Sequence, residues 1–135
     1  MTASIIYTGN LRCECTHVQS GTVFETDAPI DNRGKGERFS PTDTVCVALA
    51  TCIVTTMAIK ANDMNLDLTG TAIDVTKHMI PDPRRIGQID IFLKIPLSAK
   101  VSDTDRSLLQ KVGDNCPVAR SLHPDLKQNI QYHWL

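Results

Sequence analysis

The chain has 135 residues, with 14 Lys and Arg against 15 Asp and Glu, which gives a formal net charge of −1. The length predicts a single domain over residues 1–135 with a core of its own, and the charge balance argues against proteins that bind nucleic acid or an anionic membrane. Five cysteines, an odd number, do not suit a complete disulfide framework. Because the N-terminal segment lacks a signal-peptide pattern, we expect a cytoplasmic protein with free or transiently oxidised thiols.

Three strands are predicted in the N-terminal part of the chain. Residues 3–8 and 11–18 alternate in polarity around the turn sequence TGN, and residues 21–26 follow a Ser-Gly turn. The segment 27–41, rich in Gly, Pro and charge, predicts an irregular loop. A loop of this length usually has a function.

A long helix is predicted directly after this loop. Ser40 is suited to the N-cap, Pro41 to the first helical position, and Asp43 complements the helix dipole in the first turn. From residue 44 to about 61 the helix is apolar nearly all round, which predicts burial on most sides by a sheet and a second subunit. The apolar stretch 45–61 is shorter than a typical membrane span.

A hairpin and a last strand are predicted in the C-terminal half. Residues 66–80 and 86–97 alternate with period two on either side of PDPRR, and residues 127–135 form the closing strand. This element order predicts an α+β fold without a βαβ phosphate-binding unit.

Two short helices are predicted between the hairpin and the last strand. Ser102 or Asp103 caps a helix that runs to about Val112 and ends at Gly113. A second, shorter helix follows Cys116.

Two of the five cysteines are candidates for chemistry. Cys116 precedes Pro117 and therefore falls at a helix N-cap, where the dipole favours a thiolate and predicts a lowered pKa; a plain capping or core role is the alternative. Cys52 lies in the middle of the predicted long helix, where a buried packing role is expected. The same role is expected for Cys46. Cys46 and Cys52 are separated by about 9 Å along the axis and about 120° around it, so they cannot pair in an intact helix.

Taken together, these segments resemble the OsmC/Ohr family of thiol-dependent hydroperoxide reductases. The resemblance runs from about residue 21 to the C-terminus and is carried by SPTDTVCVALATC (40–52) after a Gly-rich loop, and by CPV (116–118). It implies an α+β intertwined homodimer, in which antiparallel sheets of both chains wrap a long buried helix from each. It also implies that Cys52 is oxidised by an organic hydroperoxide, or by hydrogen peroxide, to a sulfenic acid that Cys116 resolves as a disulfide. An external dithiol would reduce this disulfide, and no cofactor or metal is expected.

The resemblance further implies an arginine and a glutamate beside the reactive thiol. Arg33 is the first choice for the arginine and Arg38 the second. The glutamate position after the helix-opening proline is Thr42 in this chain, so the shorter Asp43 one residue later is expected to act in catalysis, while Arg38 and Thr42 are expected to bind the substrate. This departure weakens the expectation of fast peroxide turnover.

The sequence contains other candidate ligands and allows a second function. CECTH places Cys13, Cys15 and His17 on one strand face, but no fourth metal ligand accompanies them, so packing is the expected role. The remaining histidines show no metal or triad spacing, and His123, before Pro124, is expected to end the short helix. The main alternative function is a small-ligand-binding or redox-sensing protein of the same fold with weak or no peroxidase turnover.

Overall fold

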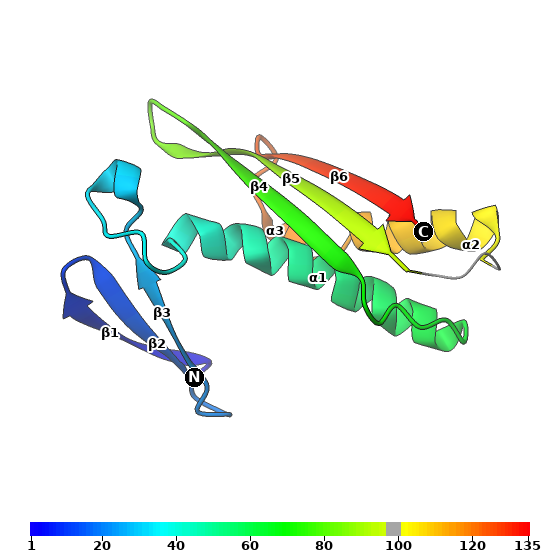
Figure 1. Cartoon of the computed structure of the whole chain (residues 1–135), viewed down its shortest axis with the longest axis horizontal. Helices are drawn as coiled ribbons and strands as arrows, with labels where there is room; N and C mark the ends of the chain where they lie inside the picture. Colours follow the sequence, from blue (N-terminus) through cyan, green and yellow to red (C-terminus); the bar gives the residue numbers. More distant parts are fainter. Residues whose placement is uncertain (97–100) are drawn as a thin grey trace. The chain divides into compact units, whose positions relative to one another are not determined.

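The computed structural model describes residues 1–96 and 101–135, and these fall into two compact units, Met1–Val45 and Cys46–Leu135. The first unit contains an antiparallel sheet in the order β1 (Ala3–Gly9), β2 (Arg12–His17) and β3 (Val23–Asp27) (Figure 1). A short 3₁₀ helix, η1 (Ile30–Asn32), lies in the loop that follows. The strands and the loop agree with the sequence prediction within about two residues.

The second unit contains the sheet β4 (Ala72–Ile80), β5 (Arg85–Ile95) and β6 (Lys127–Trp134). Figure 1 shows the helix α1 (Pro41–Asp63) lying along one face of this sheet. Two further helices, α2 (Asp103–Asp114) and α3 (Pro117–Ser121), come between β5 and β6 in the sequence. The α+β class is therefore confirmed.

The start of α1 follows the local sequence. The backbone N–H of Ser40 donates to the Asp43 carboxylate at 2.9 Å, and the Asp43 N–H donates to the Ser40 hydroxyl at 3.0 Å. This reciprocal arrangement is a capping box with Asp in place of the usual Glu, so two otherwise unpaired N–H groups are satisfied. The predicted cap and helix start are confirmed.

The core of the second unit is built by one face of α1 and one face of β5. Side chains at alternate positions of β5 are buried, as expected for a strand with one covered face. Leu109 of α2 and Cys116 belong to the same cluster. The buried residues of α1 and β5 are Cys46, Leu49, Ala50, Ile53, Met57 and Ala61, with Ile89, Ile91, Leu93 and Ile95.

The length of α1 corrects one expectation. By length and composition alone this helix could cross a membrane, because its apolar stretch is longer than the segment 45–61 suggested. Core helices of globular proteins pass the same test, and α1 contributes six side chains to the core of its own unit. This packing accounts for one face of α1 only: 33% of its apolar window is buried and Ile59 is 64% exposed, so the predicted burial on most sides is not found within one chain.

Two further predictions about the C-terminal half are corrected. The strand predicted over 66–80 begins only at Ala72, and residue 97 of the segment 86–97 lies outside the described residues. β6 pairs with β5 in parallel, so β5, α2, α3 and β6 form a βαβ crossover that the sequence did not predict. The link from β5 to α2 contains no glycine, unlike a phosphate-binding loop.

The fourth correction concerns Gly113, which lies inside α2 and does not end the helix. It is buried, and a Cβ atom at this position would lie 2.7 Å from the Tyr132 hydroxyl oxygen and 2.9 Å from the Met57 sulfur. A side chain here would have to displace the Tyr132 hydroxyl and the Met57 thioether, which fill the space between α2, α1 and β6. Ser102 is the N-cap, since its hydroxyl accepts the Asp105 N–H at 3.1 Å.

We expect Gly113→Ala to destabilise the protein by about 1–2 kcal/mol, because overpacking a filled core costs more than the helix propensity that alanine adds. Urea unfolding would measure the change. Ser107→Ala, at an exposed position of the same helix, is the matched control and should stay within about 0.5 kcal/mol of the wild type. Equal stabilities of Gly113→Ala and Ser107→Ala would contradict the close approach.

Candidate active site

The structure brings Cys52 and Cys116 together, although they are far apart in the sequence. Cys52 lies in the middle of α1 and is half-buried, while Cys116 is the N-cap of α3 and has 0% of its surface exposed. Both thiols are free, and their side chains are within hydrogen-bonding reach of each other.

The surroundings of Cys52 favour its thiolate. Desolvation by partial burial acts to raise the pKa of Cys52, but three hydrogen bonds outweigh it and the pKa lies below its ordinary value. The hydrogen-bond partners of its sulfur are the Val118 backbone N–H, the Cys116 thiol and the Thr56 hydroxyl, whose Oγ1 atom is 3.9 Å away. Cys52 is therefore the better nucleophile of the pair at neutral pH.

The surroundings of Cys116 have the opposite effect, which corrects the sequence prediction. Burial raises the pKa of the Cys116 thiol, and the neighbouring Cys52 raises it further. The Ala119 N–H donates to the Cys116 sulfur at 3.4 Å, as expected for an N-cap, but this contact does not outweigh the burial. The predicted position is correct, whereas the predicted lowering of the pKa is wrong, since it considered the dipole without burial.

A polar cluster on α2 and β6 lies close enough to Cys116 for their charges to interact, and the sequence did not predict it. The Tyr132 hydroxyl donates to the Asp114 carboxylate at 2.7 Å and lies 3.2 Å from the Gln110 carbonyl oxygen. Burial and the Asp114 carboxylate both raise the Tyr132 pKa, and the charge of a Cys116 thiolate adds to the effect. Tyr132 thus stays neutral. No local motif predicts this cluster, because its residues come from α2 and β6, which are separate in the sequence.

The predicted loop residues lie in the first unit. Arg38 donates to Glu25 at 3.2 Å and lines a surface pocket of about 330 Å³ together with Ser40 and Asp43. Thr42 contacts the Ser40 hydroxyl at 3.1 Å. Asp43 caps α1, as described above, and its catalytic role stays a prediction.

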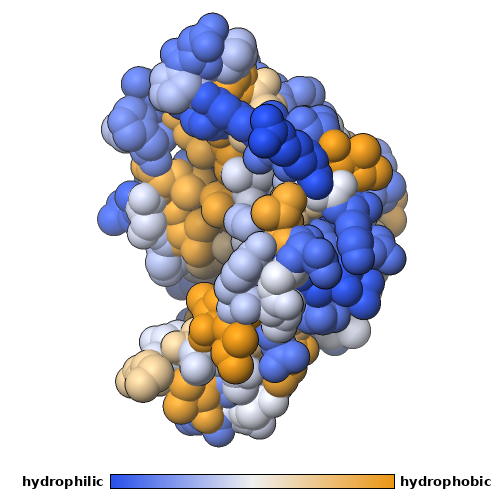
Figure 2. Space-filling model, turned by 90° about the vertical axis from the view of Figure 1, so that its left-hand side faces the viewer, coloured by the Kyte–Doolittle hydropathy of each residue, from blue (hydrophilic) through white to orange (hydrophobic). Residues whose placement is uncertain are grey.

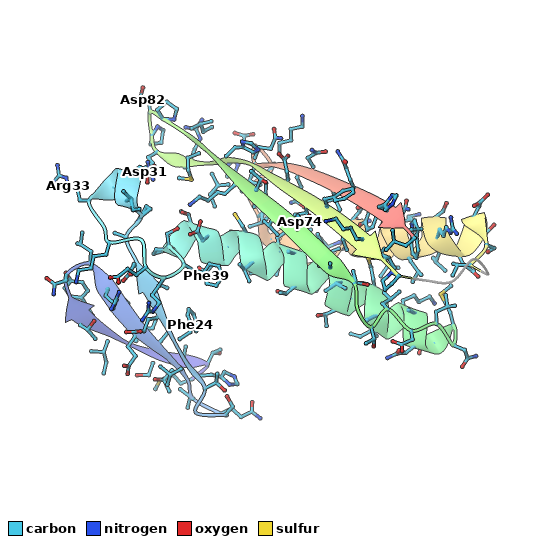
Figure 3. All side chains as sticks on the ribbon, in the orientation of Figure 1. Phe24, Asp31, Arg33, Phe39, Asp74 and Asp82 are labelled. Atoms are coloured by element: carbon cyan, nitrogen blue, oxygen red, sulfur yellow. The ribbon has the colours of Figure 1, made fainter. Side chains whose placement is uncertain are left out.

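Arg33 follows η1 with a positive φ of 67° and has an exposed side chain. Figure 3 shows it projecting outward from the loop. Within residues 1–96 and 101–135 no ion pair or hydrogen bond of its side chain is formed. The two units are described separately, so the assignment of Arg33 or Arg38 to the thiol stays a prediction.

A buried ion pair organises the same loop and was missed by sequence reasoning. Arg12 binds Asp27 through two hydrogen bonds, of 2.6 and 2.8 Å, although Asp27 is only 2% exposed. The Arg12 guanidinium holds the Asp27 pKa below its usual range, and Asp27 also accepts the Glu37 N–H at 3.1 Å. The loop containing both candidate arginines is therefore anchored to β2 and β3. In the sequence Asp27 is only a charged residue after a predicted strand, and this position does not indicate an ion pair with Arg12.

The three candidate metal ligands of the CECTH motif are packed or hydrogen-bonded within the first unit. Cys15 is buried, Cys13 is half-buried, and the His17 ring contacts the Ser20 hydroxyl at 2.6 Å. In the part of the chain that the structure describes, no three His, Cys, Asp or Glu side chains are placed to hold a metal ion. The other histidines have local partners: His78 pairs with Asp90 at 2.6 Å, and His123, one residue beyond the C-cap of α3, accepts the Asp125 N–H.

Comparisons with known proteins identify the family and the fold of the chain. The family model described as OsmC-like protein matches residues 34–131. A crystal structure from Psychrobacter arcticus, described as an osmotic-stress-induced and detoxification-response protein, is 41% identical, with a TM-score of 0.94 over 98% of this chain and 96% of that one. No curated protein sequence matches this chain.

More distant structures share the fold. An organic hydroperoxide resistance protein OsmC from Legionella pneumophila has a TM-score of 0.75 at 12% identity, over 98% of this chain and 97% of that one. A hydroperoxide resistance protein from Vibrio cholerae with captopril in one active site has a TM-score of 0.74 at 13% identity, over 98% and 91%.

The fold and the paired cysteines define a thiol protein of the α+β class. Since the family model covers most of its length, the chain belongs to the OsmC-like family, and the sequence-based resemblance to it is confirmed.

Proposed function

We propose that this protein is a thiol peroxidase that reduces organic hydroperoxides, with Cys52 as the peroxidatic and Cys116 as the resolving cysteine. The observation that carries the proposal is the contact between these two free thiols, of which Cys52 has the lowered pKa and Cys116 the raised one. A peroxidatic cysteine must ionise to attack, whereas a resolving cysteine can remain protonated until it is needed. The difference between the two pKa values matches these two roles.

The reaction begins with attack of the Cys52 thiolate on the terminal oxygen of the hydroperoxide. A sulfur–oxygen bond forms, the oxygen–oxygen bond breaks, and the alkoxide leaves and takes up a proton to become the alcohol. Cys52 is thereby oxidised to a sulfenic acid. The Cys116 sulfur then attacks the Cys52 sulfur, so that a disulfide forms and water leaves with the Cys116 proton. An external dithiol reduces the disulfide and is itself oxidised.

A thiol titration tests the proposal. One equivalent of cumene hydroperoxide should lower the number of free thiols, measured in denaturant, from five to three. In Cys116→Ser the same treatment should leave a sulfenic acid on Cys52 that a 1,3-dione probe labels. An unchanged thiol count in the wild type at this dose would refute the peroxidase.

A ligand-binding or redox-sensing protein of the same fold is the second candidate. It is favoured by the position after Pro41, where Thr42 stands in place of the glutamate that the resemblance implies, and by the capping role of Asp43. Such a protein would show a rise in melting temperature with the hydroperoxide analogue cumyl alcohol and no loss of thiols. A sensor would lose two thiols once but would not turn over with an external dithiol.

We also propose that the active form is a cytoplasmic homodimer. Apolar side chains are exposed on one face of the first sheet, where Ile5, Tyr7 and Phe24 are 63%, 62% and 53% exposed. Ile5 and Phe24 flank Cys15 in register, so they share its face. Figure 2 also shows hydrophobic atoms in several surface patches. Such surfaces in a small chain are typical of subunit interfaces.

The family match over residues 34–131 crosses both units, which supports a single OsmC-like domain.

A further inference from the structure

The hydroxyl group of Thr56 lies beside the proposed peroxidatic sulfur. Thr56 follows Cys52 by one helical turn on α1, and its Oγ1 atom is 3.9 Å from the Cys52 Sγ atom. Both residues are half-buried, so neither is fully solvated nor sealed in the core. The distance is near the upper limit for a hydrogen bond to sulfur, and ionisation of Cys52 would shorten it, because charge-assisted hydrogen bonds are shorter than neutral ones.

This contact differs from the usual behaviour of threonine in a helix. A helical threonine hydroxyl commonly donates to the backbone carbonyl three or four residues earlier. Thr51 does so, with its Oγ1 atom 2.8 Å from the Val47 oxygen and 3.2 Å from the Ala48 oxygen, and Thr44 bonds the Pro41 carbonyl. Thr56 instead has its hydroxyl directed to the Cys52 side chain, and within residues 1–96 and 101–135 it makes no other side-chain hydrogen bond.

We propose that Thr56 is a catalytic residue of this site, whose hydroxyl donates a hydrogen bond to the Cys52 thiolate. The bond is strongest while sulfur carries the negative charge, because charge-assisted hydrogen bonds exceed neutral ones. Once Cys52 is a sulfenic acid or a disulfide, the sulfur is a weak acceptor and the hydroxyl can return to the Cys52 carbonyl. Thr56 thus stabilises the reduced, ionised state selectively.

The chemical consequence has two opposing parts. Stabilising the thiolate increases the ionised fraction at neutral pH, in agreement with the lowered Cys52 pKa, to which Thr56 contributes. The same hydrogen bond makes each thiolate less nucleophilic, with a Brønsted slope of about 0.4–0.5. Removing the hydroxyl should therefore slow reaction below the Cys52 pKa and accelerate it above.

Thr56→Val tests this, since valine keeps the shape of threonine and lacks the hydroxyl. The measurement is the rate of Cys52 alkylation by iodoacetamide from pH 5 to 10, resolved from Cys46 by fragment mass spectrometry because residues 39–60 form one tryptic peptide. If the ionised fraction falls by about fivefold, as loss of one ordinary hydrogen bond gives, the rate at low pH should fall by about 2.4-fold. The plateau rate at high pH should rise by about twofold.

Two variants separate this role from helix packing. Thr56→Ser retains the hydroxyl and should restore the wild-type pH profile, while Thr51→Val removes a hydroxyl that bonds only the backbone and should leave it unchanged. Thr56→Ala provides the same readout if valine impairs folding. Superimposable profiles of the wild type and a folded Thr56→Val or Thr56→Ala variant would overturn the proposal, as would the same change in Thr51→Val.

The role of Thr56 rests on the proposed function, but the alkylation experiment tests it independently of peroxidase activity. Alkylation requires only a reactive Cys52, whereas hydroperoxide consumption requires the full peroxidase. Crossing pH profiles in a protein that consumes no hydroperoxide would retain Thr56 as the partner of the thiolate and reject the peroxidase. Normal hydroperoxide consumption with superimposable profiles would reject Thr56 alone.

Discussion

Replacement of Cys52 by serine should lower hydroperoxide turnover by at least about a thousandfold, since loss of the nucleophile removes the covalent step itself. A serine hydroxyl is not ionised at neutral pH, and it cannot form a sulfenic acid or a disulfide. The groups that favour the Cys52 thiolate would have no reactive anion to stabilise. Turnover is measured as loss of cumene hydroperoxide with dithiothreitol as the reductant.

Cys46→Ala is the matched control on the same helix. Cys46 is only 3% exposed and belongs to the core cluster, so its removal should cost about 1 kcal/mol of stability and leave turnover per folded molecule near the wild-type value. A Cys52→Ser protein that keeps a tenth of the wild-type turnover would show that another thiol is oxidised. A large loss in folded Cys46→Ala would assign chemistry to the cysteine that the structure places in the core.

Features of the fold that depend on local signals could be predicted from the sequence. Ser40 and Ser102 cap helices through residues three positions away, and the strands around the TGN turn follow from polarity that alternates along a few residues. Gly113 shows the limit of such reasoning. A glycine near a helix end usually terminates it, but here Met57 and Tyr132, both distant in sequence, require the absence of a side chain. The parallel pairing of β6 with β5 is also set by long-range packing.

In the candidate site, too, features that depend on local sequence could be predicted and those that depend on tertiary contacts could not. The identity of the two cysteines followed from family resemblance, and the N-cap position of Cys116 followed from Pro117. The direction of the Cys116 pKa did not follow, because burial and the neighbouring Cys52 are tertiary effects. The contacts of Cys52 with Val118 and Thr56 were also missed. The Thr56 contact alone had a sequence signal, a threonine four residues after a cysteine in a predicted helix.

Replacement of Arg33 by alanine should slow peroxide reduction by about a hundredfold while changing the alkylation rate of Cys52 by less than about twofold. A lowered thiol pKa gives only a small net gain in rate, since about half of the increase in thiolate, on a logarithmic scale, is offset by reduced nucleophilicity. Large accelerations must therefore come from orienting the peroxide and stabilising the departing oxygen anion, and a guanidinium group suits both tasks. Iodoacetamide has no such oxygen, so its reaction with Cys52 should be insensitive to the arginine.

Arg38→Ala is the comparison that decides between the two loop arginines. Arg38 already pairs with Glu25, whereas the Arg33 guanidinium makes no such contact with residues 1–96 and 101–135 and stays available for an oxygen anion. We therefore expect a loss in Arg38→Ala of no more than about fivefold, and partial recovery of peroxide reduction in Arg33→Lys, which keeps the charge but not the planar fork. Stopped-flow rates that are equal in Arg33→Ala and the wild type would remove Arg33 from the mechanism, and a hundredfold loss in Arg38→Ala would transfer its role to Arg38. Equal losses of peroxide reduction and alkylation in Arg33→Ala would instead show that the arginine acts through the ionisation of Cys52.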